Sequence, residues 1–389
     1  MEFLVKNCYS SLKFSLSILR MFGFIGLHEF VGIKTFMFAI YWVFWFMYID
    51  GSMLIAQIGE IFKIWGDIPL MTGASFLLFT NLALATKIIN VVSRRRAIQD
   101  LIDEGEEELR SEERQAGVNI VNSCDLETNR SLYLFTTLSA MTVFGWAASA
   151  EKNQLPLRAW YPYRTSGSPS YELTYAYQSS AVITSALVNV CLDTLVTSLI
   201  AACRCRLRLV SLSLRTLFKD IATDRLSIDE EDVVYSRLAK GVKKHEAALR
   251  SARKIQACFS IPILAQFTVS TFIICITAYQ LELNKRNWMR IVSMGAYLLC
   301  MMLQVFLYCY QGNELSIDSS AISDAVYESS WYTGSVRLRR ALLIVMLRSR
   351  RAVTLKACGF TTLSLDCFTS IIKASYTFFT VLRRVENIN

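Results

Sequence analysis

The chain has 389 residues, a net charge of +9 and a hydrophobic share of 53%, and its mean hydropathy is +0.35. These values exclude an ordinary soluble domain and indicate an integral membrane protein in contact with lipid. The basic residues gather in loops on one side of the predicted membrane, so the charge reflects topology and we expect no nucleic-acid partner.

Residues 1–32 are expected to form a cytoplasmic, amphipathic segment. Leu12, Leu16, Leu19 and Phe22 alternate there with serines and basic residues, a pattern typical of a helix that lies on or dips into the membrane. Basic residues interrupt this first apolar run, so we expect no cleaved signal peptide.

Six transmembrane helices are predicted between residues 33 and 310. Their expected ranges are 33–57, 67–92, 129–150, 173 to the arginines from Arg204 onward, 258–281 and 288–310. The triplet Arg94, Arg95 and Arg96 ends the second span and marks the cytoplasmic side. Residues 97–128 and 209–257 are charged and helix-prone, and the second stretch predicts a long cytoplasmic helical hairpin.

Residues 151–172 connect the third and fourth spans on the opposite side. Three of the five prolines and several aromatic residues lie in this stretch. This composition favours an ordered external lid over a flexible linker.

Residues 311–360 are polar and then basic, and we expect them to pack on the cytoplasmic side without spanning. Leu338, Leu342, Val345 and Ser349 share one helical face there.

A seventh span is predicted at residues 361–384, which would reach about 36 Å as a helix against a hydrocarbon core of about 30 Å. Polar residues recur along one face of this helix: Asp366, Ser370, Lys373, Thr377, Thr380 and Arg384. Ionisable groups are too costly to face lipid, so this face must meet other helices or water. It is either a polar seam between helices or, in a symmetric assembly, the lining of a pore.

Seven spans place the two termini on opposite sides of the membrane. Because most Lys and Arg residues outside the spans lie on the N-terminal side, the N-terminus is predicted to be cytoplasmic and the C-terminus extracellular. The predicted fold class is therefore an all-α membrane protein with seven transmembrane helices and a cytoplasmic helical region.

Cysteine and histidine usage argues against catalysis. The 11 cysteines fall in predicted spans or on the cytoplasmic side, so a disulfide framework is not expected. The chain has 2 histidines and no CxxC motif, which leaves little for a zinc site or a histidine-dependent hydrolase. We expect no enzyme and no cofactor.

The stretch Leu363–Phe379, together with Leu342-Leu343-Ile344 before Arg348, resembles the C-terminal signature of insect odorant receptors. The aromatic loop 155–178 is similar to the second external loop of that family, and Gly312-Asn313-Glu314-Leu315 is similar to the exit of its sixth span. The resemblance covers the whole chain and is weakest over the first 60 residues.

This resemblance implies a subunit of a tetrameric, odorant-gated, non-selective cation channel in the plasma membrane of olfactory sensory neurons. It implies that residues 311–360 form cytoplasmic anchor helices and that residues 361–389 hold the pore-lining helix and an extracellular C-terminus. The chain lacks the long insert of the family's shared co-receptor between the fourth and fifth spans. It therefore looks like a ligand-tuned subunit that forms a heterotetramer with that co-receptor.

The family's pore gate carries over to Val381, with Lys373, Thr377, Thr380 and Arg384 on the same helix. Arg384 departs from the family pattern, in which this position is polar. A cation at the mouth repels permeant cations, so Arg384 and Lys373 argue against a homomeric pore and favour one shared with the co-receptor.

The family's ligand pocket draws on the outer halves of the second, third, fourth and sixth spans. The candidate ligand contacts there are aromatic and aliphatic: Phe76, Phe79, Phe144, Trp146, Tyr177, Ile183, Met294, Tyr297 and Met301. Such stripes more often serve packing between helices. An odorant with about 250 Å² of apolar surface gains roughly 6 kcal/mol on burial before ordering costs, so a small volatile ligand is expected to bind in the micromolar range or more weakly.

Other receptor classes are disfavoured. A G-protein-coupled receptor would have the reverse orientation, and its Asn-Pro-x-x-Tyr motif is absent here. Gustatory relatives of the family end in a Thr-Tyr and Gln-Phe pattern that does not follow Tyr376. A transporter is disfavoured because no inverted repeat is evident.

Overall fold

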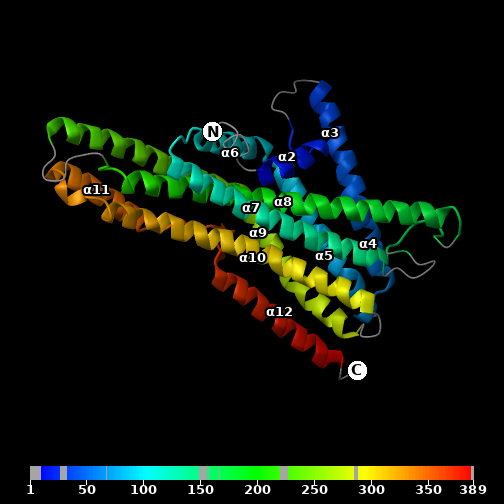
Figure 1. Ribbon diagram of the computed structural model, residues 1–389. Coiled ribbons are helices and arrows are strands. Elements are labelled where there is room, and N and C mark those ends of the chain that lie inside the picture. The colour runs from blue at the N-terminus through cyan, green and yellow to red at the C-terminus, as the bar shows by residue number, and fades with distance from the viewer. Residues whose placement is uncertain are drawn as a thin grey trace.

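The computed structural model describes residues 10–26, 33–66, 68–148, 155, 157–165, 167–219, 227–283 and 288–386. Nearly all of this part of the chain is helical, and long helices run side by side in an elongated bundle (Figure 1). One short hairpin of two antiparallel strands, β1 (Lys356–Ala357) and β2 (Thr361–Thr362), interrupts the helical pattern before the last helix.

The described residues between 10 and 110 form six helical segments. They are α2 (Ser10–Met21), α3 (Ile33–Phe46), the π-helical turn η1 (Met47–Gly51), α4 (Ser52–Lys63), α5 (Ile68–Ser93) and α6 (Arg95–Arg110). The apolar face of α2 packs against α8. Leu12, Leu16 and Leu19 are buried in the protein core, and the Ser11 hydroxyl lies 3.3 Å from that of Ser198 in α8.

Four long helices form the body of the bundle: α7 (Gln115–Ala148), α8 (Ser170–Arg215), α9 (Ile228–Leu283) and α10 (Trp288–Tyr327). Each continues well beyond the membrane span predicted within it. Residues 115–128 and 129–148, for example, are one helix. The predicted hairpin at 209–257 is formed by the ends of α8 and α9, although residues 220–226 lie outside the described part.

Five helical stretches are long and apolar enough to cross a membrane: 36–63, 70–93, 170–215, 228–282 and 291–327. The third and seventh predicted spans are helical but less apolar. Their helices are α7, whose first half is polar, and α12 (Leu365–Glu386), which carries five charged residues at 366, 373, 383, 384 and 386. The described chain is therefore that of a multi-pass membrane protein.

The region 311–360 divides into three parts. Residues 311–327 extend α10, and a 3-10 turn η2 (Trp331–Thr333) leads into α11 (Val336–Ser349). The buried face of α11 consists of Leu338, Leu342, Val345 and Ser349, so the face predicted from the sequence is confirmed.

The last helix begins four residues later than predicted, because a tight turn precedes it. Cys358 and Gly359 adopt positive φ angles of 48° and 80°, and they reverse the chain between β1 and β2. The Ser364 side chain then accepts a hydrogen bond of 3.2 Å from the backbone N–H of Cys367, which satisfies one free donor at the helix start.

Gly312 sets the distance between α10 and the entry to α12. A Cβ at this position would lie 2.7 Å from the carbonyl oxygen of Leu363, which belongs to the backbone and cannot move aside. We expect Gly312→Ala to destabilise the protein by about 1–3 kcal/mol, the usual cost of overpacking. Thermal unfolding of the purified variant in detergent measures this.

Gly295→Ala in the same helix is the matched control. Nothing lies within 4 Å of the added Cβ there, and Ala is favoured over Gly inside a helix by about 1 kcal/mol. This variant should unfold at or above the wild-type temperature. Equal losses in both variants would contradict the tight contact at Gly312.

Candidate functional site

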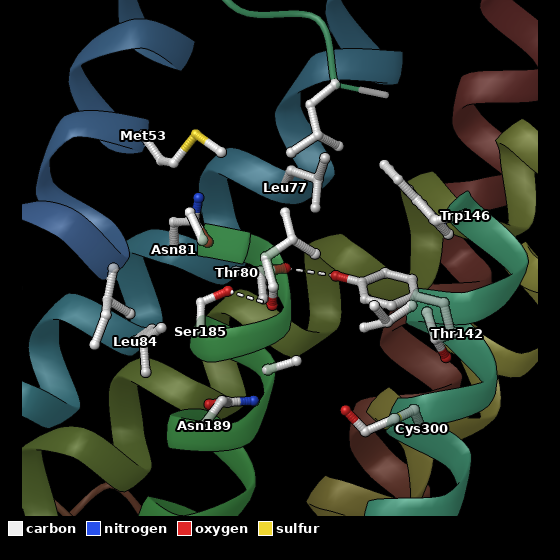
Figure 2. Close-up of a pocket in the computed structure, with 18 of the residues that line it drawn as sticks. Met53, Leu77, Thr80, Asn81, Leu84, Thr142, Trp146, Ser185, Asn189 and Cys300 are labelled. Atoms are coloured by element: carbon white, nitrogen blue, oxygen red, sulfur yellow. Dashed lines mark hydrogen bonds between the residues drawn. The ribbon is translucent and has the colours of Figure 1, made fainter. Parts of the chain in front are cut away.

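A cavity of about 90 Å³ lies between α4, α5, α7, α8 and α10 (Figure 2). Its wall is mostly apolar, contains hydroxyl and amide groups, and has no charged side chain. The lining residues are Ile49, Met53, Gln57, Leu77, Thr80, Asn81, Leu84, Phe135, Ser139, Thr142, Val143, Trp146, Leu157, Ala181, Val182, Ser185, Ala186, Asn189, Tyr297, Cys300 and Met301. A neutral, largely apolar small molecule with one or two polar atoms fits such a wall.

Hydrogen bonds hold the polar groups of the wall in place. The hydroxyls of Thr80 and Tyr297 are bonded to each other across the cavity (Figure 2). On another side, the Asn81 side chain donates to the Gln57 carbonyl oxygen at 3.1 Å. A hydroxyl or amide of the wall can replace its present partner with a polar atom of a ligand. Such a hydrogen bond would fix the orientation of the ligand in the cavity.

The loop between α7 and α8 reaches one end of the cavity. Leu157 lines the cavity, and Gln178 of α8 fixes it from both sides. The Gln178 carbonyl oxygen accepts from the Leu157 N–H at 3.2 Å, and the Gln178 amide donates to the Leu157 carbonyl at 3.2 Å. Its amide also donates to the Tyr161 hydroxyl at 2.9 Å. The described residues of this loop are therefore ordered by specific bonds, as the lid interpretation requires.

A buried charge network lies next to the cavity. Lys87 of α5 donates to Asn189, a lining residue, at 2.9 Å, and forms an ion pair of 2.6 Å with Asp193. Asp193 also accepts from Tyr308 at 2.8 Å and from Gln304, both in α10. The two ionic side chains are 4% and 3% exposed. The carboxylate is thus fully engaged, as a buried charge must be.

Three of the nine predicted pocket residues line the cavity, namely Trp146, Tyr297 and Met301. Phe76 is buried behind them, with its ring 5.4 Å from Trp146 and 5.6 Å from Tyr297. It supports the wall without forming it.

The other five predicted residues lie elsewhere. Phe144 and Ile183 are 76% and 56% exposed on the outside of the bundle. Phe79 stacks on Phe272, Met294 is buried away from the cavity, and the Tyr177 hydroxyl bonds Ser52. In a membrane protein, an aromatic residue can face either a cavity or the lipid. Residue type alone therefore could not tell the cavity-lining residues from those on the outside of the bundle.

The sequence interpretation missed the first span and the polar wall. Ile49, Met53 and Gln57 reach the cavity from η1 and α4. A usable signal was present, because small polar residues recur at helical spacing within apolar spans. Ser139 and Thr142 in α7, and Ser185 and Asn189 in α8, follow this pattern.

The predicted pore residues all lie on α12, which packs along α9 and α10 at the edge of the bundle (Figure 1). Lys373, Thr377, Val381 and Arg384 are exposed, and Thr380 is half-buried. The opposite face, with Cys367 and Ser375, is buried. The polar stripe is thus not a seam within the described part of a single protomer.

Comparison with known proteins identifies the family. The family model described as 7tm Odorant receptor matches residues 67–376, which is most of the chain. The chain belongs to the insect odorant receptor family. This odorant receptor is 24% identical over 326 residues to Odorant receptor 46a, isoform A, of Drosophila melanogaster, covering 81% of this chain and 82% of that one. It is 31% identical to Drosophila Odorant receptor 85b, covering 59% and 57%.

Solved structures share the fold. The olfactory receptor OR5 from Machilis hrabei, in complex with eugenol, superposes with a TM-score of 0.83 at 18% identity, covering 98% of this receptor and 99% of that chain. A second structure of the same olfactory receptor gives a TM-score of 0.80. The family match, and not the shared fold, identifies the protein as a receptor rather than an enzyme.

Proposed function

We propose that this receptor is a ligand-tuned subunit of an odorant-gated, non-selective cation channel. A small, uncharged volatile ligand binds in the cavity between α4, α5, α7, α8 and α10, and a co-receptor completes a heterotetramer. The observation that carries the proposal is the cavity between the helices, with a neutral wall and paired hydroxyls, inside a chain of the odorant receptor family.

The size of the cavity indicates how a ligand would act. At about 90 Å³ it is smaller than an engineered cavity of about 150 Å³ that holds benzene. Even a one-ring ligand must therefore displace a side chain of the wall. Met53 and Trp146 line the cavity with long or wide side chains that can move. A ligand that binds an expanded arrangement better than this one shifts the population toward it, which is the requirement for gating.

Helix α10 offers a physical connection from the cavity to the last helix. Met301 lines the cavity, and one turn farther along α10 the ring of Phe306 lies 5.6 Å from that of Phe368 in α12. Gln304 and Tyr308 of the same stretch bond Asp193. Movement of α10 therefore changes contacts that reach both the charge network and α12.

The exposed stripe of α12 supports a pore-lining role in an assembly. A protomer that leaves Lys373, Thr377 and Arg384 uncovered has polar and charged groups that are costly to place against lipid. The two cations disfavour four identical copies around a cation path, so a co-receptor subunit completes the channel. In this arrangement seven spans place the N-terminus in the cytoplasm and the C-terminus outside, in the plasma membrane of olfactory sensory neurons.

Trp146→Ala tests the site. We expect it to change the rank order of odorants and to shift half-maximal concentrations by about tenfold or more, because it removes an aromatic wall contact and enlarges the cavity. The measurement is the odorant-evoked current in cells that express the variant, with and without a co-receptor.

Phe144→Ala is the matched control, since it removes another aromatic side chain of α7 that lies outside the cavity. Its odorant ranking should equal that of the wild type. Identical rankings in all three proteins would exclude this cavity as the binding site. Odorant responses of normal size without a co-receptor would instead contradict the heteromeric channel.

A further inference from the structure

A second cavity, on the outside of the bundle, has features that suit a different ligand. It is a groove of about 550 Å³ between α3 and the junction of α5 with α6. Its lining residues are Phe38, Ala39, Trp42, Val92, Ser93, Arg94, Arg95, Arg96 and Ala97. Helix α3 stands at the margin of the bundle (Figure 1), so the groove opens at the surface.

The groove has one apolar wall and one basic wall. Phe38 and Trp42 of α3 supply the apolar wall, and the outer face of α3 is apolar as well, with Phe36 67% and Phe44 61% exposed. The three arginines directly follow α5, with Arg94 between the two helices and Arg95 and Arg96 at the start of α6, at the predicted boundary of the second span. A surface that is aromatic on one side and cationic on the other is suited to the interface between acyl chains and headgroups.

The arginines have different surroundings. The Arg94 guanidinium donates to the carbonyl of Ala257 in α9, so it helps to fix the junction. Arg95 lies over the ring of Phe38, with 5.1 Å from its Cζ to the ring centroid. Arg96 is exposed. Within the described residues none of the three has a carboxylate ion-pair partner.

Three arginines and two aromatic rings therefore meet around one groove. We propose that this groove binds an anionic phospholipid, with the phosphate headgroup at Arg95 and Arg96 and an acyl chain along Phe38 and Trp42.

Native mass spectrometry of the purified full-length receptor tests the proposal, with dioleoyl phosphatidic acid and dioleoyl phosphatidylcholine as probes. The wild type should bind phosphatidic acid more tightly. Because each basic residue near a lipid headgroup contributes about a fivefold gain, Arg95→Gln/Arg96→Gln should weaken phosphatidic acid binding by about 25-fold. The double variant Arg340→Gln/Arg351→Gln removes two exposed arginines elsewhere and should bind like the wild type.

Two further variants distinguish a loss of lipid contacts from misfolding and from binding of the phosphate group alone. Arg96→Gln alters only an exposed side chain, so it should fold normally and lose about fivefold in affinity. Trp42→Ala should weaken the binding of phosphatidic acid but not that of glycerol 3-phosphate, which lacks acyl chains. The proposal is overturned if the two lipids bind equally, if the groove arginines matter no more than the control pair, or if glycerol 3-phosphate binds as tightly as the lipid.

Discussion

Asp193→Asn is expected to destabilise this odorant receptor by about 3–5 kcal/mol, the usual result of leaving one member of a buried ion pair unpaired. The carboxylate lies 2.6 Å from the Lys87 ammonium, and both side chains are almost fully buried. Tyr308 and Gln304 donate to different oxygens of the carboxylate, so an asparagine keeps an acceptor for one of them and removes the charge that Lys87 requires. Thermal and denaturant unfolding of the purified protein measure the loss.

Lys87→Met/Asp193→Asn provides the test of mechanism. This double variant removes both charges and keeps an acceptor for one of the α10 side chains, so most of the lost stability should return. If the double variant is less stable than either single variant, the cost does not come from an unpaired charge.

Arg204→Met is expected to reduce the stability of the folded protein by about as much as Asp193→Asn, because it leaves partly buried carboxylates, instead of a buried ammonium, without their partner. Arg204 of α8 is 2% exposed, and its guanidinium contacts Glu127 of α7 at 2.8 Å and both Glu314 and Asp318 of α10 at 3.3 and 3.1 Å. Without it, Glu127 loses its ion pair with Arg204, and Glu314 and Asp318 are left with Arg208. Arg204→Lys should recover only part of the loss, because a single ammonium cannot reach all three acceptors with the geometry of a guanidinium.

Arg215→Met is the control within the same helix. Its pair with Glu328 is exposed on both sides, 51% and 55%, and such pairs contribute about 0–1 kcal/mol. The unfolding measurement should therefore show a large loss of stability for Arg204→Met and a small one for Arg215→Met. A large loss at Arg215 and a small one at Arg204 would remove the central role assigned to the buried arginine.

The sequence supported the helical architecture well and the cavity poorly. Hydrophobic periodicity located helices at all the predicted spans and the buried face of α11. Periodicity could not show that α8 covers α2. The element that packs on an apolar helix face is decided by the fold of the whole chain. The same limit applied to the cavity. Trp146 and Phe144 are two residues apart on one helix, and only the packing of five helices places the first at the cavity and the second outside.

The unbroken length of α10 has a mechanical consequence. As a single helix of 40 residues, it measures about 60 Å at about 1.5 Å per residue, so a tilt of about 3° moves its far end by about 3 Å. The cavity lies toward one end of this helix, the contact with α12 lies near its middle, and the junction with α11 lies at the other end. A small movement of the α10 residues at the cavity can therefore displace the far end of the helix, next to α11, without any helix unwinding.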